Sequence, residues 1–250
     1  MSAYAALNRA TYLASIRDKA TLFFTFAFPL AFLVLFGLIF HGQKVEGGLA
    51  SINYIAPGVL SWGVGNAAVF SVGFALMQWR RDDLLRLLWR TPTPLRTLLA
   101  SRWTIVLGVA TVQTVLFTSV ALLPFFGLSI DGPWWAMVPL LVLGVTAFVA
   151  LGLVVGSVAN TPEAVAAIAN ITMVPMAFLS GSFFPDDMMP HWLRTIATVL
   201  PLHYLNDGLT DAMGGRGDLT DIAVDCLGLV VFAALFGLLA TRIFRWSNRT

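Results

Sequence analysis

The residues that could carry out catalysis are few in this chain, and their spacing does not suit it. The only lysines, Lys19 and Lys44, do not stand in the G-x-x-x-x-G-K-[ST] pattern that cradles a nucleotide phosphate. No two of His41, His191 and His203 have the spacing of metal ligands on one helix. We therefore expect no catalytic residue, no metal site and no cofactor in this chain, and we expect that it is not itself an enzyme.

Two other kinds of chemistry stay open as alternatives. An intramembrane serine hydrolase would need a serine facing a histidine; Ser180 and Ser182 could serve, but no histidine falls inside an apolar stretch. Ion-coupled transport would place ionisable groups in mid-membrane. Asp225 is the one carboxylate clearly inside an apolar stretch, about a turn from its end, and Glu163 beside Pro162 has the position of a helix-capping residue.

The composition indicates an integral membrane protein. Hydrophobic residues make up 58% of the chain and charged residues only 11%, whereas soluble domains average about 25% charged residues. A helix crosses a bilayer with ~20 apolar residues, and six stretches of that length occur, at 21–40, 54–78, 103–127, 135–159, 164–184 and 222–244. We predict an all-α, polytopic membrane protein with six transmembrane helices in a single domain, residues 1–250.

The basic residues predict how these helices are oriented. Twelve of the fifteen lysines and arginines fall at residues 9–19, 80–102 and 242–249, which lie on one side of a six-span protein. Basic residues near helix ends favour the cytoplasmic side. Both termini are therefore expected on the cytoplasmic side of a cell inner or plasma membrane. On the opposite side, residues 182–221 form a long loop with many large apolar groups, which predicts short helices that dip into the outer face or cap the bundle.

The cytoplasmic segment after the second span has the pattern of a short amphipathic helix. Acidic residues begin it, arginines follow at helical spacing, and Thr91-Pro92-Thr93-Pro94 ends it. It could lie on anionic lipid headgroups or dock into a cytoplasmic partner. For docking, the candidate residues are Asp82, Asp83, Leu84, Arg86, Leu87, Trp89 and Arg90.

Amides and aromatic residues inside the spans are candidates for a substrate pathway. Large apolar groups with few polar ones suit amphipathic ligands better than sugars, although amides in a span often bind a neighbouring helix instead. Alanines at 164, 166, 167 and 169, with Gly181, could pack a second subunit or pack within one subunit. The candidate pathway residues are Asn66, Phe70, Gln113, Asn170, Met173 and Phe178.

Two motifs in this chain resemble those of one transporter family. The first is Leu-Arg-Leu-Leu-Trp-Arg-Thr-Pro-Thr-Pro-Leu at 85–95. The second is Phe-Leu-Ser-Gly-Ser-Phe-Phe-Pro at 178–185, followed by Pro-His-Trp-Leu-Arg at 190–194 and Leu-Pro-Leu-His-Tyr at 200–204, with Tyr-Ile-Ala-Pro-Gly at 54–58 adding to it. In order and spacing, the chain is similar to the type-2 ATP-binding-cassette transporter permease family over nearly its whole length.

The resemblance implies a half-transporter without its own ATPase site. Two six-span subunits would form the pathway, and two ATPase subunits would bind ATP and Mg and dock beneath. We expect the two six-span subunits to be a homodimer, or this chain paired with a close relative. Residues 1–20 would lie as an interfacial helix on the inner surface, the loop at 79–102 would couple to the ATPase, and residues 182–221 would form re-entrant helices. Candidate external gate residues are Phe183, Phe184, Pro185, Trp192 and Tyr204.

The resemblance defines the substrate class less narrowly than it defines the architecture. The family resemblance implies export of an amphipathic drug, antibiotic or lipid-like substrate, and the alternative is a lipid-linked sugar or polysaccharide. Membrane lipids are expected partners and nucleic acid is not, because the net charge of +2 is small. An intramembrane enzyme and a membrane scaffold without transport activity are the hypotheses from other classes.

Overall fold

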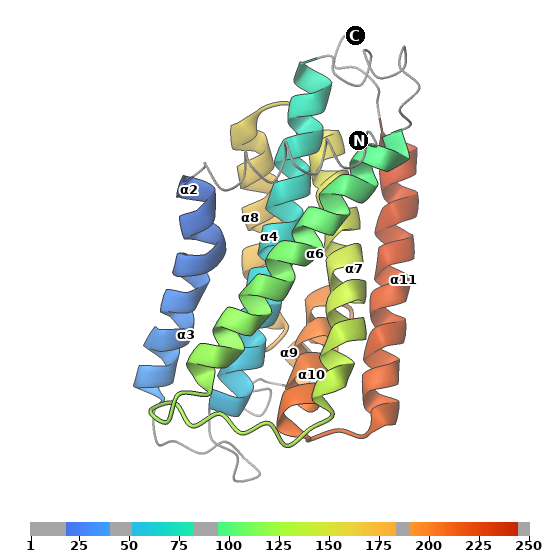
Figure 1. Cartoon of the computed structure of the whole chain (residues 1–250). Coiled ribbons are helices and arrows are strands. Elements are labelled where there is room, and N and C mark those ends of the chain that lie inside the picture. Colours follow the sequence, from blue (N-terminus) through green and yellow to red (C-terminus); the bar gives the residue numbers. More distant parts are fainter. Residues whose placement is uncertain (1–18, 41–51, 83–94, 184–190, 245–250) are drawn as a thin grey trace.

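The computed structural model describes residues 19–40, 52–82, 95–183 and 191–244. These residues form helices, and no strand occurs in the described ranges. Figure 1 shows the helices as a bundle. In chain order they are α2 (Lys19–Leu22), η1 (Phe23–Ala27), α3 (Phe28–Ile39), α4 (Ile52–Arg81), α6 (Leu95–Ala121), η2 (Trp134–Ala136), α7 (Met137–Val158), α8 (Pro162–Leu179), α9 (His191–Ala197), α10 (Pro201–Gly214) and α11 (Leu219–Ile243).

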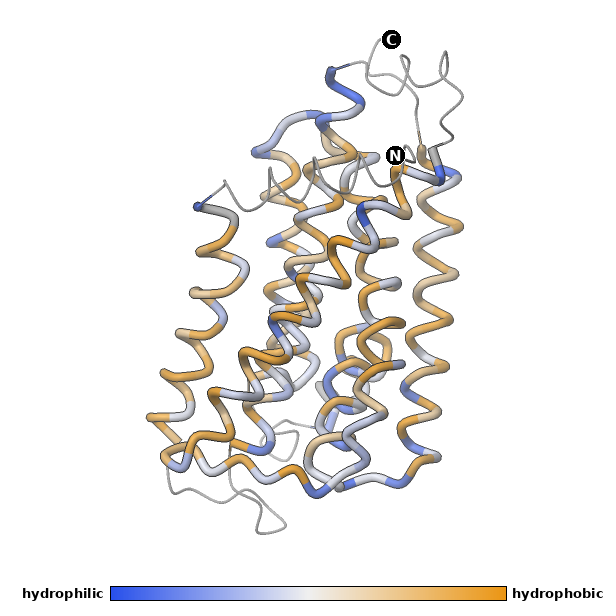
Figure 2. Tube along the Cα trace, viewed as in Figure 1, coloured by the Kyte–Doolittle hydropathy of each residue, from blue (hydrophilic) through white to orange (hydrophobic). Residues whose placement is uncertain are grey.

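Membrane-length helices occur where the sequence predicts them. By length and composition, α4, α6, α7, α8 and α11 could each cross a membrane, and Phe23–Ile39 is a shorter apolar helix that continues from α2. Figure 2 shows apolar residues along these helices and hydrophilic residues mainly toward their ends. The prediction of an all-α polytopic membrane protein is confirmed.

Several predicted boundaries differ from the structure, including the end of the third span, since α6 ends at Ala121 rather than at residue 127. The fifth span was expected to reach residue 184, but α8 ends at Leu179, and Gly181 follows with a φ of 73°. Since this left-handed conformation suits glycine, the chain can turn sharply there. The third span begins earlier than expected, because α6 starts at Leu95. The second span ends later than expected, because α4 runs on to Arg81. The predicted loop at 79–102 is therefore helical at both of its ends.

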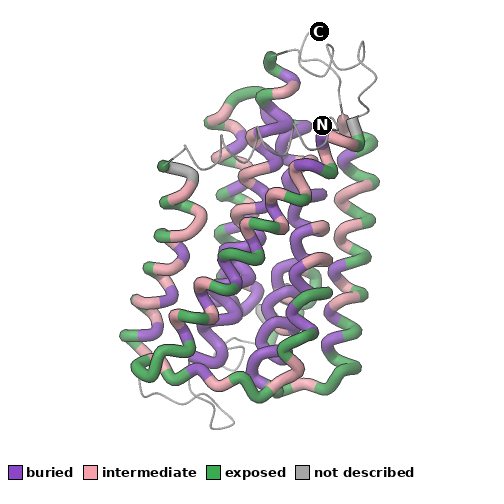
Figure 3. The backbone as a smooth tube through the Cα atoms, in the orientation of Figure 1, coloured by how far each residue is buried: buried purple, intermediate pink, exposed green. Residues whose placement is uncertain are grey.

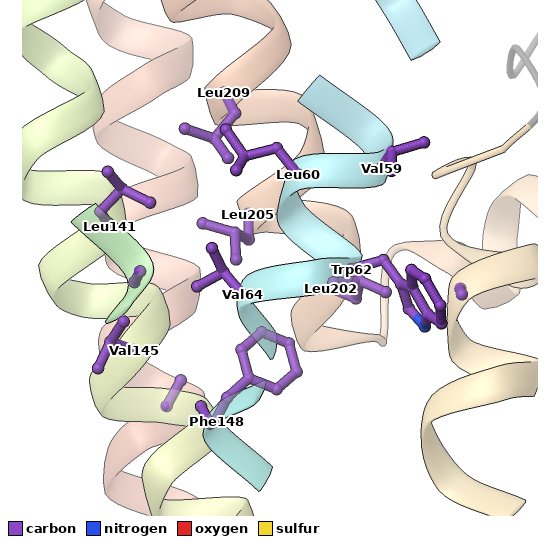
Figure 4. Packing of buried hydrophobic residues seen from close by; sticks show 14 of the residues in the cluster. Val59, Leu60, Trp62, Val64, Leu141, Val145, Phe148, Leu202, Leu205 and Leu209 are labelled. Carbon is purple, nitrogen blue, oxygen red and sulfur yellow. The ribbon is translucent and has the colours of Figure 1, made fainter. Parts of the chain in front are cut away.

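The core of the bundle lies between α4 and α7. Buried residues make up 72% of the apolar stretch of α4 but 17% of that of α11, which packs along α7. Figure 3 shows this contrast between the centre and the outer helices. Figure 4 shows Val64 and Leu60 of α4 facing α7 and α10, while Trp62 points the other way. The labelled core side chains from α7 and α10 are Leu141, Val145, Phe148, Leu202, Leu205 and Leu209.

Glycines let α4 and α7 approach closely. A Cβ on Gly152 would lie 2.9 Å from the carbonyl oxygen of Val69, and one on Gly156 would lie 2.7 Å from that of Gly73. Helices in membranes associate through such close packing, because lipid provides no hydrophobic force between them. The two helices therefore form a tightly fitted pair.

A proline explains an irregular turn in the first apolar helix. Pro29 has no N–H, and in a regular helix its ring would clash with the carbonyl of Thr25 four residues earlier. The chain instead widens into the π-helix η1, where the Phe28 N–H donates to the Phe23 carbonyl. The Thr25 carbonyl accepts a hydrogen bond from Gln113 Nε2 on α6, at 3.1 Å. This bond ties the first span to the third.

The two ends of the bundle carry opposite charge. The described chain starts and finishes at the same end, where α2 begins and α11 ends (Figure 1). That end holds Lys19, Arg80, Arg81, Arg96, Arg102 and Arg242, together with Asp82 and Glu163. The short helices α9 and α10 lie at the opposite end (Figure 1), where Asp207, Asp211, Asp218 and Asp221 are found with Arg216. For brevity we call these the basic end and the acidic end.

Candidate functional site

The predicted docking segment lies mostly outside the described residues. Asp82 follows α4 directly and is exposed at the basic end. Asp83, Leu84, Arg86, Leu87, Trp89 and Arg90 lie outside the described residues, as do residues 1–18 of the predicted interfacial helix. The structure does show which helices this segment joins, because α4 leads into it and α6 follows it.

The last turn of α4 is held by its two neighbours. Arg80 is only 3% exposed, and its Nη1 donates to the carbonyls of Gly156, Ser157 and Ala159 at 2.8, 2.7 and 3.2 Å. Its Nη2 lies 3.4 Å from Asn160 Oδ1. Carbonyls at a helix C-terminus lack partners within the helix, and a cation there also suits the helix dipole. Arg80 therefore caps the end of α7.

An aromatic contact links the same turn of α4 to α6. The guanidinium of Arg102 lies over the Trp79 ring, 5.7 Å from its centroid. The next residue of α6, Trp103, donates from its Nε1 to Thr146 Oγ1 of α7 at 3.0 Å. Thus α4, α6 and α7 are joined to one another beside the predicted docking segment.

The candidate pathway residues lie on three helices and in different surroundings. Asn66 and Phe70 are half-buried on α4, whereas Asn170 and Phe178 are exposed on α8. Met173 is fully buried, with its methyl and the Phe148 ring against Gly65. Gln113 is also fully buried and donates to a neighbouring helix, as the alternative for intramembrane amides predicts. A role for these residues in transport stays a prediction.

An aromatic cluster surrounds the first candidate gate residue. Phe183 is 4% exposed, and its ring centroid lies 5.4 Å from that of Trp62, 5.6 Å from Phe36, 6.0 Å from Phe32 and 5.2 Å from Phe178. Aromatic pairs at these distances attract one another beyond the area that they bury. Phe183 therefore anchors the chain after α8 against α3 and α4.

The sequence analysis missed several members of this cluster. Phe24, Phe28, Phe32, Phe36 and Phe40 recur every four residues, so they follow one stripe of a helix. Neighbours in this stripe from Phe24 to Phe40 have ring centroids 5.0 to 6.3 Å apart. That spacing is a signal that could have identified the stripe, whereas no signal in the sequence pointed to Trp62.

The turn after α8 also rests directly on α4. The Tyr54 hydroxyl donates to the Gly181 carbonyl, and the Ser182 carbonyl packs so closely on Gly58 that a Cβ there would overlap it. Asn206 Nδ2 on α10 donates to the Ser180 carbonyl at 3.2 Å. Ser180 and Ser182 are thus buried in the packing of this turn, which fixes it between α4 and α10.

Two of the other candidate gate residues, Trp192 and Tyr204, lie at the acidic end. Tyr204 on α10 donates from its hydroxyl to the Thr198 carbonyl at 2.8 Å, and its ring covers Gly228 of α11. Trp192 on α9 is 64% exposed, as an aromatic residue in a membrane interface would be. Phe184 and Pro185 lie outside the described residues. The structure thus places Phe183 in the bundle and the other two described candidates on the short helices.

The acidic end contains a buried carboxyl, that of Asp211. Burial raises the pKa of Asp211 above its usual range, Arg216 opposes the rise, and Asp221 adds to it. Arg216 Nε lies 3.8 Å from Asp211 Oδ1, and its guanidinium stands over the Tyr54 ring. No group of three acidic, histidine or cysteine side chains in the described ranges is arranged to hold a metal ion.

Comparison with known proteins finds relatives among membrane permeases. The chain is 31% identical over 110 residues to the linearmycin resistance permease protein LnrN of Bacillus subtilis, covering 44% of this chain and 28% of that relative. It is 26% identical over 231 residues to the daunorubicin resistance ABC transporter permease protein DrrB1 of Streptomyces coeruleorubidus, covering 88% and 78%. It is 24% identical over 237 residues to the putative transport permease YvfS of Bacillus subtilis, covering 92% of each chain.

The family itself is identified by a match over most of the chain. Residues 2–213 match the model of the ABC-2 type transporter family. The match includes the predicted docking segment, the aromatic cluster and the turn after α8, and it stops within α10. A bundle of apolar helices with charged ends agrees with a membrane transport subunit. The chain belongs to the ABC-2 type transporter family of membrane permeases.

Proposed function

We propose that this protein is the membrane-spanning subunit of an ATP-binding-cassette exporter. It moves an amphipathic drug, antibiotic or lipid-like substrate out of the cytoplasm or the inner leaflet. The energy comes from ATP, with Mg, hydrolysed by a separate ATPase subunit. The observation that carries the proposal is the family match over residues 2–213, and relatives named for linearmycin and daunorubicin resistance support the substrate class.

The assembly that we propose contains two permease subunits and two ATPase subunits. Several apolar side chains of α8 are exposed, including Ile171 at 74%, and so is the amide of Asn170. An amide facing hydrocarbon is unfavourable. A second copy of the chain, or a water-filled pathway between two copies, would give this helix a better environment.

The proposed orientation places the basic end on the cytoplasmic side of the inner or plasma membrane. Basic residues beside spans favour that side, and the basic end holds six of the eight lysines and arginines in the described ranges. Asp82 and the docking segment then face the ATPase. The aromatic cluster, with Phe183, lies toward the outer side and would close the exit.

The test begins with co-expression of the chain and a stand-alone cassette ATPase from the same genome. The intact protein should retain the ATPase in neutral detergent and should carry daunorubicin into inverted vesicles only when ATP is supplied. Arg86→Glu with Arg90→Glu should remove both properties, because an interfacial ion pair that loses one partner costs ~2–5 kcal/mol.

Neutral detergent separates docking from lipid binding, because it contains no anionic headgroups. If the double variant kept the ATPase at the level of the intact protein, the docking role of these arginines would be wrong. Transport that proceeds without ATP would overturn the proposed function itself. The control is Arg242→Glu, an exposed arginine at the end of α11, which should keep docking.

A further inference from the structure

We infer that Arg80 is a positioning residue for transport: it makes the end of α7 and the start of α8 follow the end of α4 when an ATPase moves the docking segment. This inference rests on the proposed function, because the movement must come from the ATPase. It concerns only how the movement continues inside the membrane subunit.

The hydrogen bonds of Arg80 give it this role. Only Arg81 separates it from Asp82, the first residue of the docking segment, so it moves with the last turn of α4. Its guanidinium holds three carbonyls at the end of α7 and approaches Asn160, which precedes α8. Hydrogen bonds from a charged donor are stronger than neutral ones, and the planar guanidinium fixes their directions.

The position of these bonds matters as much as their strength. The connection between α7 and α8 contains only residues 159–161, and the Thr161 side chain caps α8 by accepting from the Ala164 N–H. Pulling on the end of α7 therefore also pulls on the first turn of α8. Through one side chain, the end of α4 holds two other spans.

Packing below Arg80 makes the connection stiff. Gly156 contacts the backbone of α4 at Gly73, and Val165 of α8 packs on the same glycine. Close-packed interfaces of this kind do not deform continuously. The end of α4, the end of α7 and the start of α8 are thus expected to move together rather than to slide past one another.

A static role is the alternative, in which Arg80 only stabilises the helix end. Stability alone does not distinguish the two, because either role predicts a weaker fold when the guanidinium is removed. The ratio of substrate transported to ATP hydrolysed does distinguish them. A static cap leaves this ratio unchanged in the molecules that stay folded, whereas a residue that passes on movement lowers it.

The experiment measures this ratio for Arg80→Met in vesicles that contain the assembled complex. Transport of daunorubicin per ATP should fall at least about fivefold, the lower range of coupling between distant sites, while the ATPase stays bound. Arg80→Lys should fall less, because an ammonium still donates to some of the carbonyls. Arg81→Met is the matched control, since Arg81 is exposed on the same turn. An Arg80→Met ratio equal to that of the control would overturn the inference.

A second measurement keeps Arg80 intact and covers the case in which Arg80→Met does not fold. Spin labels are placed at Gln78→Cys on α4 and Val158→Cys on α7, both exposed, in a Cys226→Ser background without other cysteines. The distance between the labels should be the same without nucleotide and with ATP bound. A change of about 5 Å, one helical turn, would overturn the inference. Singly labelled proteins identify any distance that arises between subunits.

Failure of the inference can be told apart from failure of the proposed function. If the intact protein neither binds an ATPase nor transports with ATP, the proposed function is wrong. If the intact protein does both and the two measurements give the overturning results, only the role of Arg80 is wrong.

Discussion

The hydrogen bond between Gln113 and Thr25 should matter only because Pro29 is present. Gln113→Leu removes this donor to the Thr25 carbonyl, and losing the partner of a polar group costs up to about 1–3 kcal/mol when the group is buried. The loss is reduced because Gln113 Oε1 is itself buried without a partner. We expect a net cost of about 1–2 kcal/mol. Pro29→Ala restores an N–H that can donate to the same carbonyl.

The assay is a double-mutant cycle read from thermal unfolding in detergent. Gln113→Leu should lower the unfolding midpoint by about 2–8 °C, taking about 2–4 °C per kcal/mol for a chain of this length. In the Pro29→Ala background the same substitution should cost close to nothing, which gives a coupling of about 1 kcal/mol or more. If the two substitutions were additive, the explanation of the π-helical turn by Pro29 would be refuted.

Two further predictions concern the part of the bundle near the acidic end. Gly58→Ala should lower the unfolding midpoint and weaken ATP-dependent transport, because its Cβ overlaps the Ser182 carbonyl and overpacking costs about 1–3 kcal/mol. Gly108→Ala, where nothing lies within 4 Å, should leave both unchanged, and equal effects of the two would contradict this. Asp211→Asn should raise the unfolding midpoint at pH 7. Burial raises the pKa of the Asp211 carboxyl in the folded protein, so ionising this carboxyl lowers the stability of the folded protein as pH rises above about 4. A pH titration of both proteins should show this gain vanish below about pH 4, and a constant difference would contradict the pKa shift.

The positions of the spans could be predicted from the sequence for a simple physical reason. A bilayer demands about 20 apolar residues for each crossing, so composition and length locate a span within a few residues. Charge asymmetry in the sequence likewise separates the basic end from the acidic end. The exceptions are the ends of α4, α6 and α8. Hydropathy does not show whether the polar residues next to a span continue its helix or belong to the following loop.

Contacts between spans could not be predicted in the same way. Arg80 was one arginine among six in a basic stretch, and nothing in that stretch shows that its guanidinium turns back to the end of α7. Gln113 was grouped with pathway residues, although its amide binds the Thr25 carbonyl. Such contacts depend on the rotation of each helix about its axis, and packing decides this rotation. The sequence of an apolar span with little periodicity does not reveal the rotation.

The length of α4 has a mechanical consequence. The helix has 30 residues and is therefore about 45 Å long, with Arg80 bound to α7 near one end and Tyr54 bound to the turn after α8 near the other. A rod fixed near the basic end of the bundle acts as a lever arm. A tilt of only about 5° would displace its far end by about 4 Å over that length. A small rotation at the basic end is thus magnified into a movement as large as an aromatic ring at the opposite end.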